Sequence, residues 1–245
     1  MNPNIHVADT PEQLGTQAAK VIAGHLREAL SQGGSARIVL STGASQFETI
    51  AALTREDVDW SRVEMFHLDE YVGLPESHPA SFRKYLKERF VSKVSLKGAY
   101  FVDGEGDVGA MIEALTKELL KQPVDVGVIG IGENGHIAFN DPPADFDTKE
   151  SFLVVDLDER CKQQQVGEGW FETVDDVPKQ AITMSVNRIM QCRHIISAVP
   201  HAVKADAVFH TVTDEVTPQV PATILKTHPS WRLFLDKASA AKLPA

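Results

Sequence analysis

Residues 124–146 read VDVGVIGIGENGHIAFNDPPADF, and this stretch indicates both a fold class and a place to look for chemistry. Its first half is apolar and rich in β-branched residues, which predicts a buried strand. A glycine-rich turn follows, with His136 directly after it and Asp141 five residues further on. Because an imidazole titrates nearer to neutral pH than other side chains, a histidine in this setting indicates proton transfer. A hydrogen-bonded structural imidazole is the alternative interpretation.

The same turn contains the spacing of a dinucleotide-binding motif, Gly130-x-Gly132-x-x-Gly135. That motif requires a helix to follow directly, so that the helix N-terminus can bind the pyrophosphate. Pro142 and Pro143 come too soon for a helix of useful length. We therefore expect no nicotinamide or flavin cofactor.

Predicted strands and helices alternate along the whole chain. We expect strands at residues 37–40, 63–68, 99–102, 124–131, 152–157, 181–186, 194–199 and 231–235, and helices at 10–32, 46–53, 81–90, 108–120, 160–166, 202–209 and 222–225. This alternation predicts an α/β protein with an open, mostly parallel, doubly wound sheet and helices on both faces. No internal repeat or linker interrupts it, so we expect one domain over residues 1–245.

The composition narrows the class of partner. A formal net charge of −10 argues against nucleic acid as the main partner. No apolar run is long enough to span a membrane, and the N-terminus lacks the pattern of a secretion signal, so we expect a cytoplasmic protein. Cys161 and Cys192 show no zinc-binding spacing and are expected to be reduced and structural. The oligomeric state is left open, with a homo-oligomer as one expectation.

Four polar clusters follow predicted strands. In open parallel sheets, ligands bind beyond the carboxyl ends of the strands, so we expect these clusters to meet along one edge. They are Ser41–Ser45, Asp69–Glu70, Gly130–Asp141 and His201–Lys204.

The chemistry of these clusters suits a small anionic substrate. The Ser41–Ser45 cluster, STGAS, offers small residues and hydroxyls at a predicted helix start, as anion sites do, although a simple N-cap turn is the alternative. Lys204 can add positive charge, unless it is an ordinary surface lysine. Asp69 is a candidate base, with a surface or capping carboxylate as the alternative. Together they predict a sugar-phosphate-like substrate and proton transfer by Asp69 and His136 without a metal.

Five motifs carry a resemblance to a known family. They are LSTGAS at 40–45, FHLDEYVGLPESHPASF at 66–82, GIGENGHIAFNDPP at 130–143, VPKQAITMSV at 177–186 and PATILKTHPSWRLFLD at 221–236. The chain resembles the glucosamine-6-phosphate deaminase (isomerase) family, within the wider group that includes 6-phosphogluconolactonases. The HIAFN continuation is similar to the deaminase branch, since the lactonase branch typically continues that histidine into a Thr-Ala-Ser run.

The resemblance implies deaminating isomerisation of an amino-sugar 6-phosphate, such as glucosamine 6-phosphate to fructose 6-phosphate and ammonia. It implies that His136 opens the pyranose ring and that Asp69 moves the C2 proton towards C1, with Asn134 and Asp141 beside the histidine. It also implies no cofactor and no metal. The substrate- and phosphate-binding residues that it implies are Ser41, Thr42, Gly43, Ala44, Ser45, Gly132 and Lys204.

The chain departs from the family pattern in two places. Asn134 and Asp141 stand where well-known members have aspartate and glutamate, so His136 is expected to have one carboxylate partner instead of two. A second phosphate-binding arginine is also missing, with Gln165 at its expected place and Arg160 or Lys162 as possible substitutes. The basic residues of the family's allosteric site are not found, so we expect no allosteric control.

Three alternatives to glucosamine-6-phosphate deamination stay open at this stage. The chain could hydrolyse the ester of 6-phosphogluconolactone, which needs no base aimed at C2. It could act on galactosamine 6-phosphate. It could also be a non-catalytic phosphosugar sensor, although the basic helix-turn-helix of a DNA-binding regulator is absent and the first strand is expected only near residue 37.

Overall fold

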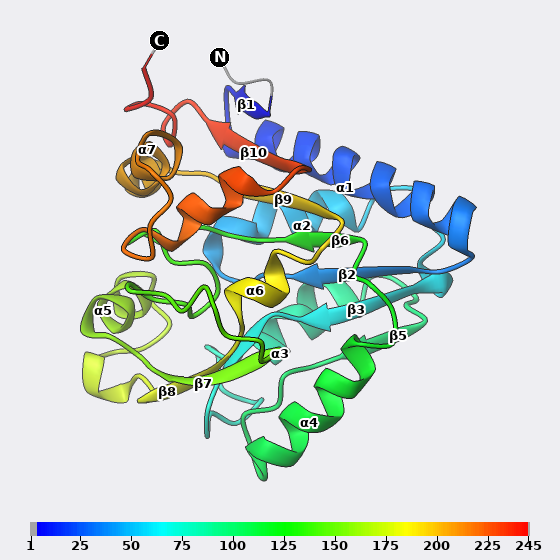
Figure 1. The fold of residues 1–245 in the computed structure, drawn as a ribbon, viewed down its shortest axis with the longest axis horizontal. Coiled ribbons are helices and arrows are strands. Elements are labelled where there is room, and N and C mark those ends of the chain that lie inside the picture. Colours follow the sequence, from blue (N-terminus) through cyan, green and yellow to red (C-terminus); the bar gives the residue numbers. More distant parts are fainter. Residues whose placement is uncertain (1–3, 245) are drawn as a thin grey trace.

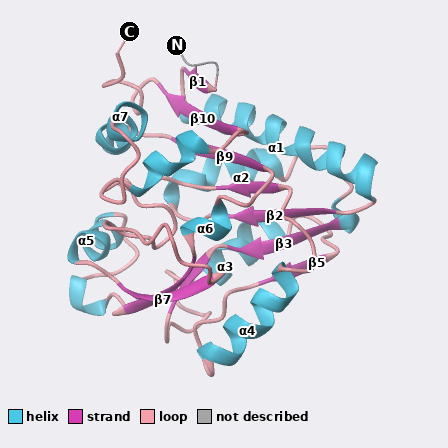
Figure 2. Ribbon diagram, viewed as in Figure 1, coloured by secondary structure: helices cyan, strands magenta, loops and turns pink. Residues whose placement is uncertain are grey.

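The computed structural model describes residues 4–244, and its centre is a seven-stranded sheet in which all paired neighbours run parallel (Figures 1 and 2). The strand order is β1-β10-β9-β6-β2-β3-β5. The predicted open, parallel α/β sheet is therefore confirmed. The prediction of one domain includes residues 1–3 and 245, which lie outside the described residues. The bounds of the strands are β1 Ile5–Ala8, β2 Ala36–Leu40, β3 Val63–His67, β5 Gly98–Tyr100, β6 Val126–Val128, β9 His194–Val199 and β10 Trp231–Asp236.

Helices cover both faces of this sheet, each face with its own apolar core (Figure 1). The side chains of β2 alternate between the two cores, with Ile38 and Leu40 in one and Val39 in the other. The first core contains residues of α1, α2 and α3, and the second contains residues of α4, α6 and α7. The helices are α1 Pro11–Gly33, α2 Phe47–Leu53, α3 Phe82–Leu86, α4 Val108–Leu119, α5 Glu159–Gly167, α6 Val186–Ile189 and α7 Ala205–Thr213.

Three of the predicted helices include or consist of a π-helix or a 3-10 helix. A π-helix, Lys87–Val91, extends α3, and the 3-10 helix Ala202–Lys204 precedes α7. The segment predicted as a helix at 222–225 is the 3-10 helix Pro221–Thr227. The remaining 3-10 turns are Ala44–Gln46, Trp60–Arg62 and Val174–Asp176. None of the described helices is long and apolar enough to cross a membrane.

A second, three-stranded antiparallel sheet lies beside the main one. It consists of β4 Asp69–Tyr71, β8 Gln180–Met184 and β7 Phe152–Asp156, in the order β4-β8-β7. The strands predicted at 152–157 and 181–186 therefore exist but do not join the parallel sheet. Of the two strands, only β7 alternates between more and less buried residues, whereas β8 is buried from Ala181 to Met184, as β2 and β3 are throughout. That alternation is typical of an antiparallel sheet with one solvated face.

The expectation that the first strand lies near residue 37 is wrong. Residues Ile5–Ala8 form β1, which pairs in parallel with β10 at the edge of the main sheet. The strand is short, and only Ala8 is fully buried, so it carries little of the apolar pattern that marks a central strand. The next element agrees with the sequence, since Thr10 accepts a hydrogen bond from the Gln13 backbone N–H and caps α1.

Candidate active site

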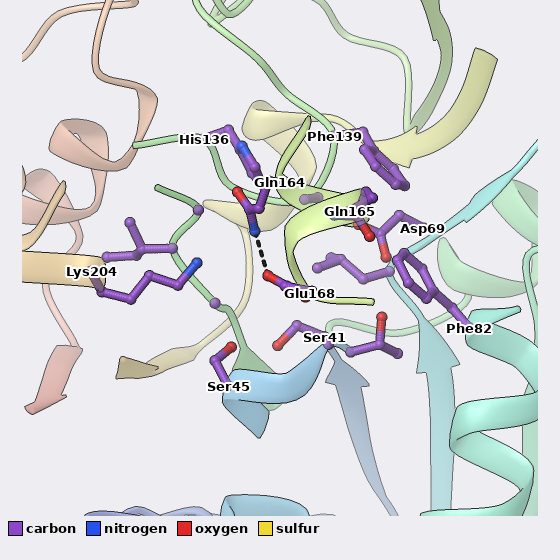
Figure 3. A pocket seen from close by; sticks show the side chains of 17 residues that line it. Ser41, Ser45, Asp69, Phe82, His136, Phe139, Gln164, Gln165, Glu168 and Lys204 are labelled. Carbon is purple, nitrogen blue, oxygen red and sulfur yellow. Dashed lines mark hydrogen bonds between the residues drawn. The ribbon is translucent and has the colours of Figure 1, made fainter. Parts of the chain in front are cut away.

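A cleft lies at the carboxyl edge of the main sheet, where all four predicted polar clusters contribute residues (Figure 3). Ser41 follows β2, Asp69 follows β3, and Lys204 follows β9. The cleft encloses about 550 Å³, including space at its open mouth. The residues that line it are Ser41, Thr42, Gly43, Ser45, Leu68, Asp69, Phe82, Gly130, Ile131, Gly132, His136, Ala138, Phe139, Gln164, Gln165, Glu168 and Lys204.

Three of the predicted site residues do not line this cleft. Ala44 and Asn134 line a neighbouring hollow instead. Asp141 lies behind His136, with its Oδ1 3.2 Å from the imidazole Nδ1. Asn134 and Asp141 can therefore act on a ligand only through the histidine that they contact.

Asp69 and Glu70 are adjacent carboxylates in different environments, because neighbouring residues of a strand point to opposite sides. Asp69 lines the cleft, is only 6% exposed, and its Oδ1 has no hydrogen-bond partner. Burial, with a contribution from the negative charge of Glu70, raises the pKa of Asp69 to about 8. A buried carboxylate of this kind becomes a strong base once it loses its proton.

Glu70 has a structural role at the start of α3. Its carboxylate accepts hydrogen bonds from the backbone N–H groups of Tyr71, Phe82 and Arg83, from the Ser81 hydroxyl and from the Arg83 guanidinium. These bonds satisfy N–H groups that a helix start leaves unpaired. Glu70 therefore fixes the segment that follows β4 and leaves Asp69 free to face the cleft.

His136 is oriented by the two residues that differ from the family pattern. Its Nδ1 lies 2.6 Å from Asn134 Oδ1 and 3.2 Å from Asp141 Oδ1. The Asn134 side-chain NH₂ donates a hydrogen bond to Asp141 Oδ1 at 3.2 Å, which leaves Asn134 Oδ1 facing the histidine. Asn134 Oδ1 and Asp141 Oδ1 are therefore both hydrogen-bond acceptors for His136 Nδ1. Nδ1 therefore carries the ring proton in the neutral tautomer, and Nε2 is the nitrogen that can accept a proton.

Asp141 is the single carboxylate partner that the sequence leads us to expect. Burial alone would raise the pKa of Asp141, but hydrogen bonding and charge from His136, with the Asn134 amide, outweigh burial and lower it. The ionised Asp141 can thus stabilise a positive charge on His136.

The glycine at 132 is required by the position of the imidazole. A Cβ atom on Gly132 would lie 2.2–2.4 Å from three ring atoms of His136. Contacts this short do not occur, so any side chain here would displace the histidine. The loop from Gly135 to residue 151 contains no helix. The interpretation of the glycines as a histidine-bearing turn, without the helix of a dinucleotide site, is therefore confirmed.

The other end of the cleft is suited to an anion. The loop after β2 turns at Gly43, with φ of +97°, and Tyr85 Oη donates to its carbonyl at 3.0 Å. Ser41 Oγ is buried without a hydrogen-bond partner.

Lys204 is only 4% exposed and makes no ion pair with any residue that the structure describes. Burial lowers the pKa of Lys204, while the charges of Glu168 and Glu133 oppose that shift. Lys204 is therefore not the ordinary surface lysine of the alternative interpretation.

Helix α5 and the residue that follows it supply cleft residues that sequence reasoning missed. Gln164 and Glu168 lie one helical turn apart, and Gln164 Nε2 donates to Glu168 Oε1 at 2.8 Å. The polar run QQQ at 163–165 has no apolar pattern that marks a buried position, yet Gln165 is only 6% exposed. Buried polar side chains without a structural bond often face a ligand. Phe82 and Phe139 are further lining residues that the sequence did not indicate.

The three candidates for a second anion-binding residue have different positions. Lys162 pairs with Glu159 at 3.0 Å and does not line the cleft. Arg160 is exposed and lines only the neighbouring hollow. Gln165 does line the cleft, but Figure 3 shows its amide towards Asp69, away from Lys204.

Among residues 4–244, one group of side chains could hold a metal ion. Ligand atoms of His136, Asp141 and Cys161 lie within 4.8 Å of one another. Burial and the nearby aspartates Asp141 and Asp158 raise the pKa of the Cys161 thiol, and a neutral thiol is a weak metal ligand. The expectation of a metal-free site therefore stays a prediction, which activity after treatment with a chelator can test.

The fold and the cleft together define a class of α/β proteins that bind small anionic ligands at the carboxyl edge of a parallel sheet. Residues 9–233 match the family model described as glucosamine-6-phosphate isomerases/6-phosphogluconolactonase. The chain belongs to this family.

Individual relatives give the same placement. A glucosamine-6-phosphate deaminase of Streptococcus suis is 38% identical over 98% of this chain and 99% of the relative. One of Oenococcus oeni is 33% identical over 89% of this chain and 90% of the relative. The solved structure of a monomeric glucosamine-6-phosphate deaminase matches with a TM-score of 0.87 at 27% identity, covering 97% of this chain and 99% of that one. A 6-phosphogluconolactonase of Trypanosoma brucei, at 20% identity and a TM-score of 0.79 over 99% of each chain, shares the fold.

Proposed function

We propose that this protein is a glucosamine-6-phosphate deaminase, which converts glucosamine 6-phosphate and water to fructose 6-phosphate and ammonia. The observation that carries the proposal is the cleft itself, where a buried Asp69 and an oriented His136 share one space with the anion-binding end. The similarity to deaminases over nearly the whole chain supports it.

His136 is proposed to open the pyranose ring. Its Nε2 can accept the proton of the C1 hydroxyl and deliver a proton to the ring oxygen as the C1–O5 bond breaks. The positive charge that His136 carries between these two transfers is stabilised by Asp141, 3.2 Å from Nδ1. Asn134 keeps the ring in the required orientation through its bond to Nδ1.

Asp69 is proposed to move the proton from C2 to C1. Its carboxylate takes the C2 proton, the electrons of that C–H bond form a C1–C2 double bond, and O1 gains a proton, which yields an enolamine. Returning the proton to C1 leaves an iminium ion at C2, which adds water and releases ammonia. The low polarity around Asp69 favours this role, since an ionised carboxylate is a stronger base where it is poorly solvated.

The anion end is proposed to hold the 6-phosphate. Ser41, Thr42 and Ser45 offer hydroxyl groups, the loop through Gly43 and Ala44 offers backbone N–H groups, and Lys204 offers an ammonium. Binding energy from this end would position C1 and C2 between His136 and Asp69. Gly132 contributes by leaving room for the imidazole.

Several further properties belong to this proposal. We propose one domain, no cofactor, no allosteric control, a role in N-acetylglucosamine catabolism and a cytoplasmic location, where the two free, buried cysteines would stay reduced. Nucleic acid and membranes are not proposed as partners. A homo-oligomer is an expectation that light scattering can test.

The test is a comparison of three reactions with the purified protein. Ammonia release from glucosamine 6-phosphate is expected to be faster than from galactosamine 6-phosphate, and hydrolysis of 6-phosphogluconolactone is expected to be at background. Faster release from the galactosamine epimer would change the substrate and keep the chemistry. Lactone hydrolysis without any ammonia release would replace the proposal by the lactonase alternative.

A further inference from the structure

Glu168 is a carboxylate at the anion end of the cleft. It lines both the cleft and the neighbouring hollow, together with Lys204. Its two oxygens are held in place, since Oε1 accepts from Gln164 Nε2 at 2.8 Å and Oε2 accepts from the Trp170 indole at 3.1 Å. Figure 3 shows the Lys204 amine and the Glu168 carboxylate pointing towards each other across the cleft.

The charges at this end nearly cancel. Among the residues that line the cleft, Lys204 is the single lysine or arginine and Glu168 lies opposite it. Arg160 lines only the neighbouring hollow. A phosphate dianion bound beside Lys204 would therefore meet one positive and one negative side chain in a partly buried space, where charge interactions are stronger than in water.

A protonated phosphate fits this arrangement better. A phosphate monoester has a second pKa of about 6, so its monoanion carries one P–OH donor at mildly acidic pH. Lys204 can donate to an anionic oxygen while the Glu168 carboxylate accepts the P–OH hydrogen. Gln164 and Trp170 hold the Glu168 carboxylate in one orientation, and each of its oxygens can accept a further hydrogen bond.

We infer that Glu168 is a specificity-determining residue that restricts the anion end to a group with a single negative charge and a hydrogen-bond donor, such as the monoprotonated form of a sugar phosphate. This rests on the proposed function only in taking a sugar phosphate as the ligand. Its consequence is that the affinity for a phosphate ester falls as the pH rises through the second pKa of the phosphate.

Other titratable and charged groups face Lys204 and Glu168 from the surrounding elements. They lie on the turn after β6, on α5, before α7, at the start of β4 and on α3, and they are Glu133, His136, Arg160, His201, Asp69 and Tyr85. Any of these could alter binding with pH, so the test depends on a variant at Glu168 and not on the pH profile of the native protein alone.

The test is calorimetric binding of glucitol 6-phosphate, which cannot react because it has no carbonyl or amine, at pH 5.5 and pH 8. The native protein is expected to bind it at least tenfold more tightly at pH 5.5. Glu168→Gln is expected to bind at least tenfold more tightly than the native protein at pH 8 and to lose most of the pH dependence. Thermal unfolding of the variant checks that it is folded.

Two comparisons distinguish the role of Glu168 from other causes of pH-dependent binding. Loss of the Lys204 proton at high pH would also weaken binding of the phosphate. In that case Glu168→Gln would bind more weakly than the native protein at pH 8, because the Glu168 charge helps Lys204 to keep its proton. Glu159→Gln removes the same charge from α5 at a position paired with Lys162 outside the cleft, and it is expected to behave like the native protein.

The outcomes distinguish this inference from the proposed function. Unchanged or weaker binding by Glu168→Gln at pH 8 would overturn the inference, even if the native protein releases ammonia. Tighter binding of unphosphorylated glucosamine than of glucitol 6-phosphate would also overturn it. The expected binding pattern in a protein that releases no ammonia would support the inference and reject the proposed function.

Discussion

The proposed catalytic residues of the base end follow strands of the main sheet, whereas the anion end combines such residues, Ser41 and Lys204, with Glu168 from beyond α5. At the base end, Asp69 and His136 follow β3 and β6 of the main sheet, and both are buried. At the anion end, Lys204 faces Glu168, which lies just beyond α5. Cys161 of α5 packs with Tyr71 and Ala181 of the small antiparallel sheet, in a separate apolar cluster. The proposed chemistry thus depends on the parallel sheet, whereas the proposed selectivity depends on a helix beside it.

The largest expected effect tests the base end. Asp69→Asn should lower kcat for ammonia release by about 10³-fold or more, because it removes the proposed base and keeps the shape. KM should change little, since the anion end is intact. Steady-state assays measure both, and a variant with near-native kcat would show that Asp69 is not the base.

The next effect tests the anion end. Lys204→Met should lower kcat/KM by about 10- to 100-fold, mostly through KM, because one charge-assisted hydrogen bond to the substrate is lost. Lys162→Met is the matched control, since Lys162 pairs with Glu159 away from the cleft. A fall in kcat alone would place Lys204 at the reacting carbons and remove the division between the two ends.

The raised pKa of Asp69 has a consequence for stability that needs no substrate. In the unfolded chain an aspartate has a pKa of about 3.9, whereas burial raises it to about 8 in the folded protein. The folded state therefore holds this proton more tightly, and its stability contribution is lost as the pH rises from about 4 to about 8. The melting temperature of Asp69→Asn should exceed that of the native protein at pH 8 and match it near pH 4. Equal melting temperatures at pH 8 would contradict the raised pKa.

The smallest expected effect concerns the partner of His136. Asn134→Asp adds a second carboxylate near the imidazole and should stabilise its protonated form. Ammonia release from glucosamine 6-phosphate should rise by about two- to fivefold, a change well within what one neighbouring charge produces. A slower variant would show that the native Asn134 does not limit ring opening.

The residues of the base end could be predicted because each follows a buried strand within a distinctive segment. The apolar pattern locates the ends of β3 and β6, and Asp69 and His136 come two and eight residues after those ends. The convergence of Ser41 and Lys204 on the same edge follows from the parallel topology.

The role of α5 could not be predicted in the same way. Glu168 follows a polar helix, and neither its bonds to Gln164 and Trp170 nor its position opposite Lys204 follows from local pattern. The strand β1 was missed because four residues at a sheet edge carry too little periodicity. The small sheet was missed because pairing direction depends on tertiary contacts that strand propensity does not encode.

The most direct test of the account follows the hydrogen at C2 in glucosamine 6-phosphate labelled there with deuterium. With the native protein, we expect ammonia release with a primary isotope effect and fructose 6-phosphate whose deuterium has left C2, for C1 or for solvent. With Asp69→Asn, the label should remain at C2 in unconverted substrate. Ammonia release from the Asp69→Asn protein with the same loss of label would contradict the assignment of Asp69 as the base that acts at C2.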